Sequence, residues 1–122
     1  MKLYEGLKVV EFTTNIAGPT VGQWLAEYGA EVIHIERPVI GDDSRAYPPL
    51  VNGISIKYCT LNHGKKSVIL DLKDPDGNKI ARELCKDADI VLESTRPGVM
   101  DRLGLGYEAM HELNPRLIYC SV

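Results

Sequence analysis

With 122 residues and a mass of 13.5 kDa, the chain has the size of a single domain. It is 44% hydrophobic and 25% charged, which is typical of a folded globular protein and excludes disordered and collagen-like chains. Its net charge of −3 argues against a general electrostatic affinity for nucleic acid. No apolar run approaches the ~20 residues of a membrane span, and no signal peptide opens the chain, so we expect a cytoplasmic protein with no membrane partner.

The first 36 residues predict one complete β-α-β unit. Residues 8–13 (KVVEFT) are typical of a strand, and Pro19 then stands where a helix can begin. Gly29 is a typical helix C-terminal stop, and residues 31–36 (EVIHIE) form the second predicted strand. Between them, four apolar residues have the spacing of one helix face: Val21, Trp24, Leu25 and Tyr28.

Residues 37–56 show no periodic pattern and contain several helix and strand breakers: Pro38, Gly41, Pro48, Pro49 and Gly53. A stretch this long without its own pattern is usually a functional loop or a surface excursion. The third predicted strand, residues 66–71 (KSVILD), comes next.

The rest of the chain continues the alternation. Asp74, Pro75 and Asp76 open a second helix, because an N-cap acid, a proline and a further acid favour a helix start. Three apolar residues in it recur every four positions: Ile80, Leu84 and Ala88. A strand at 90–93, a short helical turn after Gly98, a helix at 107–113 and a fifth strand at 117–122 complete the prediction.

Five strands separated by helices predict an α/β fold, a Rossmann-like open parallel sheet with helices on both faces. Residues 1–122 form one unit in this prediction, with no internal repeat. Val122 lies inside an apolar run, whereas a parallel strand is normally buried beneath a further element of the chain, so the chain looks cut short. The alternative is a natural last strand at a sheet edge.

In open α/β sheets, ligands bind outside the carboxyl ends of the strands. Small and polar residues come after the first strand there, and Arg37, Lys73 and Arg96 come after the next three. Arginine and a helix N-terminus both suit a phosphorylated ligand, so this edge is the expected binding site. The alternative is that these three cations are solvated and paired with nearby acids.

Other kinds of site find little support. Glu36 occupies the ribose-binding position of a dinucleotide fold, but the Gly-x-Gly-x-x-Gly fingerprint and the Walker loop are absent. Asp42 and Asp43 stand in a Gly/Pro loop and are expected to be solvated, and His34 to be packed or facing a polar edge. Neither a disulfide framework nor a metal pattern emerges, and all three cysteines are expected to be structural: Cys59, Cys85 and Cys120.

Several sequence blocks resemble, in order, the N-terminal part of the family III CoA-transferases, which include formyl-CoA and carnitine CoA-transferases. The blocks cover nearly the whole chain: GLKVVEFT (6–13), AGP (17–19), YGAEVIHIERP (28–38), NHGKKS (62–67), LDLK (70–73), RPGVMDRLGLG (96–106) and NPRLIY (114–119). The order and number of the blocks make the resemblance specific.

The resemblance implies that CoA or an acyl-CoA binds at this edge as a substrate, with no permanently bound cofactor. The backbone at Ile16 and Ala17 would approach CoA, and Arg37 would meet its nucleotide end. Further contacts would come from two segments and one cation: Leu70, Asp71, Leu72 and Lys73; Ser94, Thr95 and Arg96; and Arg102. Family members commonly have Asn and an aromatic residue where this chain has Ser94 and Thr95, which weakens those two assignments.

The resemblance also implies an enzyme that moves CoA between an acyl-CoA donor and a carboxylic acid acceptor. In the family an Asp carboxylate attacks the thioester, giving a mixed anhydride and then an aspartyl-CoA thioester. That Asp lies beyond the equivalent of Val122, so no catalytic residue is assigned here. The 122-residue chain alone is therefore expected to be inactive. The interlocked homodimer of the family also needs the missing portion. The alternatives are an α-methylacyl-CoA racemase-like enzyme and a non-catalytic CoA- or nucleotide-binding module.

Overall fold

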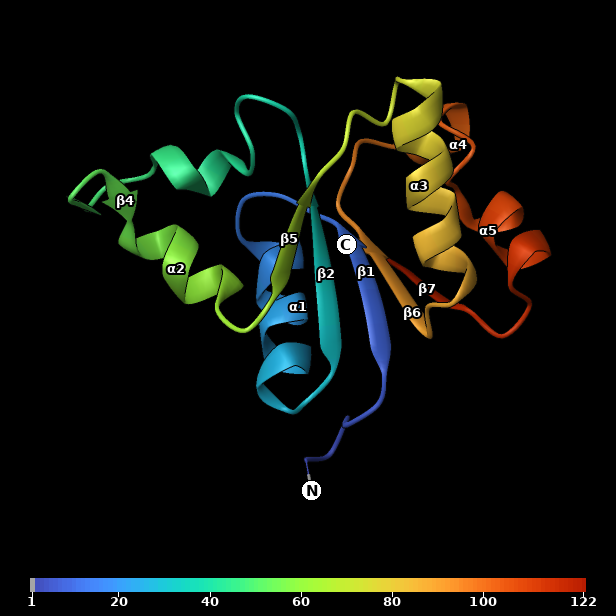
Figure 1. Ribbon diagram of the computed structural model, residues 1–122, viewed down its shortest axis with the longest axis horizontal. Helices are drawn as coiled ribbons and strands as arrows, with labels where there is room; N and C mark the ends of the chain where they lie inside the picture. The colour runs from blue at the N-terminus through green and yellow to red at the C-terminus, as the bar shows by residue number, and fades with distance from the viewer. Residues whose placement is uncertain (1) are drawn as a thin grey trace.

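The computed structural model describes residues 2–122, and its centre is a five-stranded, entirely parallel sheet in the order β5-β2-β1-β6-β7 (Figure 1). The strands are β1 (Lys8–Phe12), β2 (Glu31–Glu36), β5 (Lys66–Ile69), β6 (Ile90–Glu93) and β7 (Ile118–Ser121). In the register, Val10 of β1 pairs with Ile33 of β2 and with Val91 of β6. This confirms the predicted open parallel sheet, with strand ends within two residues of the expected ones.

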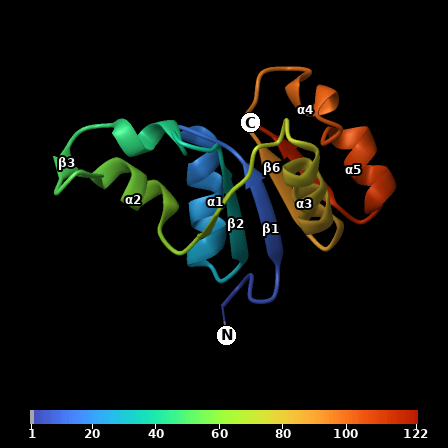
Figure 2. The ribbon, with the colours of Figure 1, turned by 45° about the horizontal axis from the view of Figure 1, so that its top comes forward.

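Helices cover both faces of the sheet, as Figure 2 shows. Helix α1 (Ala17–Glu27) lies on one face, and α3 (Pro75–Lys86), α4 (Val99–Arg102) and α5 (Tyr107–Leu113) lie on the other. Two apolar clusters hold these layers together. The larger one joins Val10 and Val91 of the sheet to Ala81, Cys85 and Met110 of the helices.

Helix α1 buries only part of its predicted apolar face. Val21 and Leu25 pack against the smaller cluster, which contains Val9, Val32 and Leu92 of the sheet. Trp24 and Tyr28 instead are 60% and 54% exposed. The apolar spacing therefore predicted the helix correctly but overstated the width of its buried face.

Helix α3 begins as predicted; of its predicted apolar residues Leu84 and Ala88 pack in the core, whereas Ile80 does not. The Asp74 side chain accepts hydrogen bonds from the backbone N–H groups of Asp76 and Gly77. Ala81 and Cys85 are fully buried, whereas Ile80 is 49% exposed. Because α3 packs on the strands through its small side chains, the residue with the larger apolar surface is left outside.

The segment after β2 contains more regular structure than its sequence predicts. It forms a 3₁₀ turn (η1, Asp43–Ala46), a short antiparallel hairpin of β3 (Leu50–Val51) and β4 (Ile54–Ser55), and then α2 (Ile56–Asn62). The Ser55 side chain caps α2 by accepting a hydrogen bond from the Tyr58 N–H. The excursion lies beside α1 (Figure 1), and within residues 37–56 the 3₁₀ turn and the hairpin are elements that the sequence did not predict.

The cysteines are all free, with Cys85 buried, Cys120 half-buried and Cys59 exposed. Burial raises the pKa of the Cys85 thiol to about 12, so this thiol is inert. Within residues 2–122 no cluster of three or more His, Cys, Asp or Glu side chains could hold a metal ion. In the same range no helix has the length and apolarity needed to cross a membrane.

Candidate functional site

The strand order places a topological switch point between β1 and β6. From β1 the chain crosses to β2 on one side, whereas it enters β6 on the other side after β5 and α3. A crevice is expected where neighbouring strands lead away in opposite directions. A pocket of about 390 Å³ lies there, lined by Thr14, Asn15, Ile16, Ala17, Gly18, Ser94 and Val122.

The turn that enters α1 forms one wall of this switch-point pocket. Asn15 adopts a left-handed backbone conformation, with φ of 77°. Its N–H donates to Asp42 Oδ1 at 3.2 Å, and the Thr14 N–H donates to Ser94 Oγ, also at 3.2 Å. No side chain caps the helix at Ile16, so the first backbone N–H groups of α1 are left for a ligand.

Gly18 is required for the close contact between this turn and β1. A Cβ at this position would lie 2.5 Å from both Cβ and Cγ2 of Thr13 and 3.3 Å from Cβ of Ser94. We expect Gly18→Ala to lower the free energy of unfolding by about 1–3 kcal/mol, since overpacking forces backbone shifts. Urea denaturation of the wild type and the variant would measure the loss, and an unchanged free energy of unfolding would contradict it.

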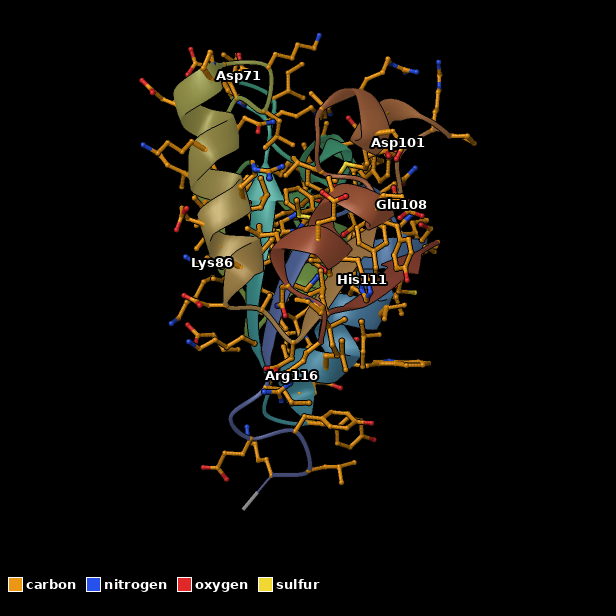
Figure 3. All side chains as sticks on the ribbon, turned by 90° about the vertical axis from the view of Figure 1, so that its right-hand side faces the viewer. Asp71, Lys86, Asp101, Glu108, His111 and Arg116 are labelled. Atoms are coloured by element: carbon orange, nitrogen blue, oxygen red, sulfur yellow. The ribbon has the colours of Figure 1, made fainter. Side chains whose placement is uncertain are left out.

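A second, larger pocket opens at the same end of the molecule, between α3 and α4. Its volume is about 500 Å³, and it is lined by Leu72, Lys73, Pro75, Asn78, Lys79, Arg82, Glu83, Arg102 and Leu103. Figure 3 shows that Asp71, just before α3, and Asp101, on α4, both lie toward this end, while Arg116 lies toward the other and Lys86 lies at the opposite end of α3 from Asp71. We call this space the α3–α4 cavity.

Two side chains of α3 hold the walls of the α3–α4 cavity together. Asn78 Nδ2 donates to the Leu72 carbonyl at 3.1 Å and to the Leu103 carbonyl at 2.8 Å. Arg82 Nη1 donates to the Gly104 carbonyl at 2.5 Å. The segments that carry Lys73 and Arg102 are therefore fixed relative to the same helix.

The residues expected to contact a ligand divide between these two pockets. Ile16, Ala17 and Ser94 line the switch-point pocket, whereas Leu72, Lys73 and Arg102 line the α3–α4 cavity. The remaining expected residues line neither pocket: Arg37, Leu70, Asp71, Thr95 and Arg96. Lys79 and Arg82 were missed, since on the sequence they look like the polar face of an ordinary amphipathic helix.

Two of the residues outside the pockets, Arg37 and Thr95, contact carboxylates of the protein. Arg37 Nη2 lies 2.5 Å from Asp43 Oδ1, so this cation is neutralised within its own loop. The Thr95 N–H and hydroxyl both donate to Glu93 Oε2, at 2.8 and 2.7 Å. Arg96 is exposed, on the segment that leads from the switch-point pocket to α4.

A buried ionic cluster lies beneath this edge of the sheet. His34 Nδ1 lies 2.6 Å from Glu11 Oε1, and His34 Nε2 lies 3.2 Å from Asp42 Oδ2. Lys65 Nζ contacts the same Glu11 oxygen at 2.7 Å. Burial by itself would lower the pKa of His34, but the contacts with Asp42 and Glu11 outweigh it and raise the value to about 9.

The prediction that Asp42 is solvated was wrong, since this residue is only 2% exposed. Its Oδ1 accepts from the Ser44 N–H at 2.8 Å and the Ser44 hydroxyl at 2.6 Å, besides the Asn15 N–H. Burial would raise the pKa of Asp42, but the contact with His34 and these hydrogen bonds lower it below the usual range. Asp42 thus connects the buried His34 to the turn of the switch-point pocket.

Glu36 is also buried and is saturated by protein groups. Arg45 binds it through two nitrogens at 2.7 Å each, and the hydroxyls of Tyr58 and Ser67 donate to it at 2.9 and 2.6 Å. Burial would raise the pKa of Glu36, but these bonds and the Asp42 N–H lower it well below its usual range. No acceptor is left for a ribose hydroxyl, which agrees with the missing dinucleotide fingerprint.

The chain matches the model of a known protein family over nearly its whole length. The family model described as CoA-transferase family III matches residues 4–122. The chain belongs to the family III CoA-transferases.

Curated relatives of this family III chain are considerably longer than it is. It is 43% identical over 123 residues to the human succinyl-CoA:glutarate CoA-transferase, covering 100% of this chain and 28% of that one. It is 44% identical over 118 residues to the acetyl-CoA:oxalate CoA-transferase of Acetobacter aceti, covering 97% and 30%. The family III chain therefore spans less than a third of these relatives.

A solved structure agrees with the fold. A CAIB/BAIF family protein from Brucella suis is 41% identical, and its superposition has a TM-score of 0.92. The match covers 98% of the family III chain and 33% of that protein.

Proposed function

We propose that this chain is the CoA-binding, N-terminal part of a CoA-transferase that moves CoA between an acyl-CoA donor and a carboxylic acid acceptor. The observation that carries the proposal is the pair of pockets at the carboxyl edge of the sheet, in a chain that belongs to this family. The named relatives are transferases, which favours transfer over racemisation.

The two pockets suit the two ends of one elongated molecule. The switch-point pocket is lined by small and apolar groups and by free backbone N–H donors, which suits the thioester end of an acyl-CoA. The α3–α4 cavity is lined by four basic side chains, which suits the phosphorylated nucleotide end. Residues 94–102 lead from one pocket to the other, since Ser94 lines the first and Arg102 the second.

We place CoA against the residues that the family resemblance implies. The backbone at Ile16 and Ala17 would face the thioester end, with Ser94 and Thr95 as the neighbouring wall. The remaining contacts would come from Arg37, Leu70, Asp71, Leu72, Lys73, Arg96 and Arg102. Arg37 would exchange its bond with Asp43 for one with the nucleotide.

The catalytic step would need a carboxylate from outside this sequence. That carboxylate would attack the thioester carbonyl and expel CoA as a thiolate, which then attacks the enzyme's carbonyl in the mixed anhydride, releasing the donor acid and leaving CoA as a thioester on the enzyme. The acceptor carboxylate would attack this thioester and expel the thiolate again, which then attacks the acceptor's carbonyl, giving the new acyl-CoA and freeing the enzyme carboxylate. CoA is thus a substrate and not a resident cofactor. We expect no acyl transfer from the purified 122-residue chain, and the interlocked homodimer stays a prediction for the full-length protein.

Isothermal titration with CoA tests the proposal. We expect Arg102→Ala to weaken CoA binding by about 1–3 kcal/mol, because a charge-assisted bond to a phosphate is lost. Arg116→Ala is the matched control: Arg116 is also exposed, but it lies toward the opposite end of the molecule (Figure 3). If the folded protein does not bind CoA, or if both variants lose affinity equally, the proposed site is wrong.

A further inference from the structure

The four basic side chains of the α3–α4 cavity lack acidic partners. They are Lys73, Lys79, Arg82 and Arg102, and the cavity wall contains a single carboxylate, that of Glu83. Across residues 2–122, none of the four has a carboxylate oxygen within 4.0 Å. Four other basic side chains of this acidic protein are ion-paired: Arg37, Arg45, Lys65 and Lys66. Cations that share a cavity and repel one another are suited to an anion.

Two of these cations come from α3 and not from the segments that the family resemblance implicates. Lys79 and Arg82 are three residues apart, so their side chains neighbour each other on one helix face. Arg82 uses Nη1 for the Gly104 carbonyl, and a guanidinium has further N–H donors to offer. Lys79 is exposed and has no acidic partner within 4.0 Å in the described part of the chain.

Arg37 and Arg96 line neither pocket, so within the α3–α4 cavity Lys73 and Arg102 alone would face more phosphate than they can neutralise. CoA has a diphosphate and, on its ribose, a 3′-phosphate monoester, which bears nearly two negative charges at neutral pH. Two cations from the loop before α3 and from α4 match the diphosphate in number. The pair on α3 then remains for the monoester.

We propose that Lys79 and Arg82 bind the 3′-phosphate of CoA, so that the α3–α4 cavity distinguishes CoA from 3′-dephospho-CoA. This inference rests on the proposed function, and it adds a specificity site to it. The two ligands differ only in that phosphate, so the difference between their affinities measures the contribution of the 3′-phosphate to binding.

The test is a titration of the purified protein with CoA and with 3′-dephospho-CoA. We expect CoA to bind about tenfold more tightly or better, which is the range for a hydrogen bond to a charged group. Lys79→Ala should reduce that ratio about tenfold by weakening CoA binding alone. Lys79→Arg should keep most of the ratio, since the positive charge remains. Lys86→Ala is the control, because Lys86 is an exposed lysine at the far end of the same helix (Figure 3).

The possible failures can be told apart. Equal affinities for the two ligands would overturn the 3′-phosphate assignment and leave the CoA site intact. A ratio unchanged by Lys79→Ala would also overturn it, because the selectivity would then come from elsewhere. If the wild-type protein binds neither ligand, both the proposed function and this inference fail. Circular dichroism of each variant would show that it is folded.

Discussion

Replacing Lys65 by Met should lower the free energy of unfolding by about 3–5 kcal/mol, since it breaks a buried ion pair and leaves His34 to balance two buried carboxylates, Glu11 and Asp42. The Lys65 side chain is 1% exposed and that of Glu11 is 0% exposed. Lys65 Nζ also donates to the Pro19 carbonyl at 2.8 Å and to Asn62 Oδ1 at 2.9 Å. The substitution therefore leaves three acceptors without their donor.

The adjacent residue provides a matched control. Lys66 is also paired with a glutamate, Glu31, but the two side chains are 68% and 41% exposed. Exposed pairs contribute little, so Lys66→Met should leave the free energy of unfolding nearly unchanged. Urea denaturation monitored by circular dichroism would measure both variants. Equal losses for the two would contradict the role assigned to the buried cluster.

The sequence was sufficient to predict the sheet, but it was not sufficient to predict the buried ionic cluster. The apolar runs of the five strands are local signals, and they predicted the sheet and its direction. The burial of Asp42 depends on His34 and Asn15, which other elements bring to it, and no local pattern reports that. A charged residue in a Gly/Pro loop is normally solvated, so the expectation for Asp42 matched the common case.

The proposed binding site shows the same division. Polar residues at strand ends predicted a site at the edge of the sheet where both pockets lie, because the carboxyl ends of parallel strands share one edge. Local sequence did not show that Arg37 pairs with Asp43, or that Lys79 and Arg82 share a cavity with Arg102 of α4. Helix α2 was missed because its stability comes from the Ser55 cap and from packing beside α1, and not from an apolar period of its own.

Stability should also fall as the pH rises from about 6.5 to 9, because of His34. Its pKa is raised from 6.5 to about 9, so the folded state holds a proton that the unfolded state releases first. The stabilisation is complete below the unfolded pKa and is lost as the pH rises through the folded one. A shift of this size corresponds to about 3 kcal/mol.

Three charged groups face the His34 ring: Glu11, Asp42 and Lys65. Burial lowers the pKa of Lys65, so the loss of the Lys65 proton makes stability rise with pH, opposite to the effect of His34. This contribution of Lys65 remains in a variant in which His34 alone is replaced. In His34→Gln the fall between pH 6.5 and 9 should disappear. His63→Gln should keep the wild-type profile, because His63 is half exposed and its contact is with Glu27 at the surface.

The pH profile connects the buried cluster to the binding site. Once His34 loses its proton, Asp42 loses the cation at its Oδ2, and Asp42 is the acceptor that holds the Asn15 N–H in the turn of the switch-point pocket. We therefore expect CoA affinity to fall over the same pH range as stability, and both dependences to vanish together in His34→Gln. Unfolding free energy and CoA affinity measured at pH 7, 8 and 9, where the 3′-phosphate of CoA is already nearly fully charged, would check this. Identical stability profiles for the wild type and His34→Gln would mean that Glu11 and Asp42 surround a neutral ring, so the turn would not respond to the His34 proton.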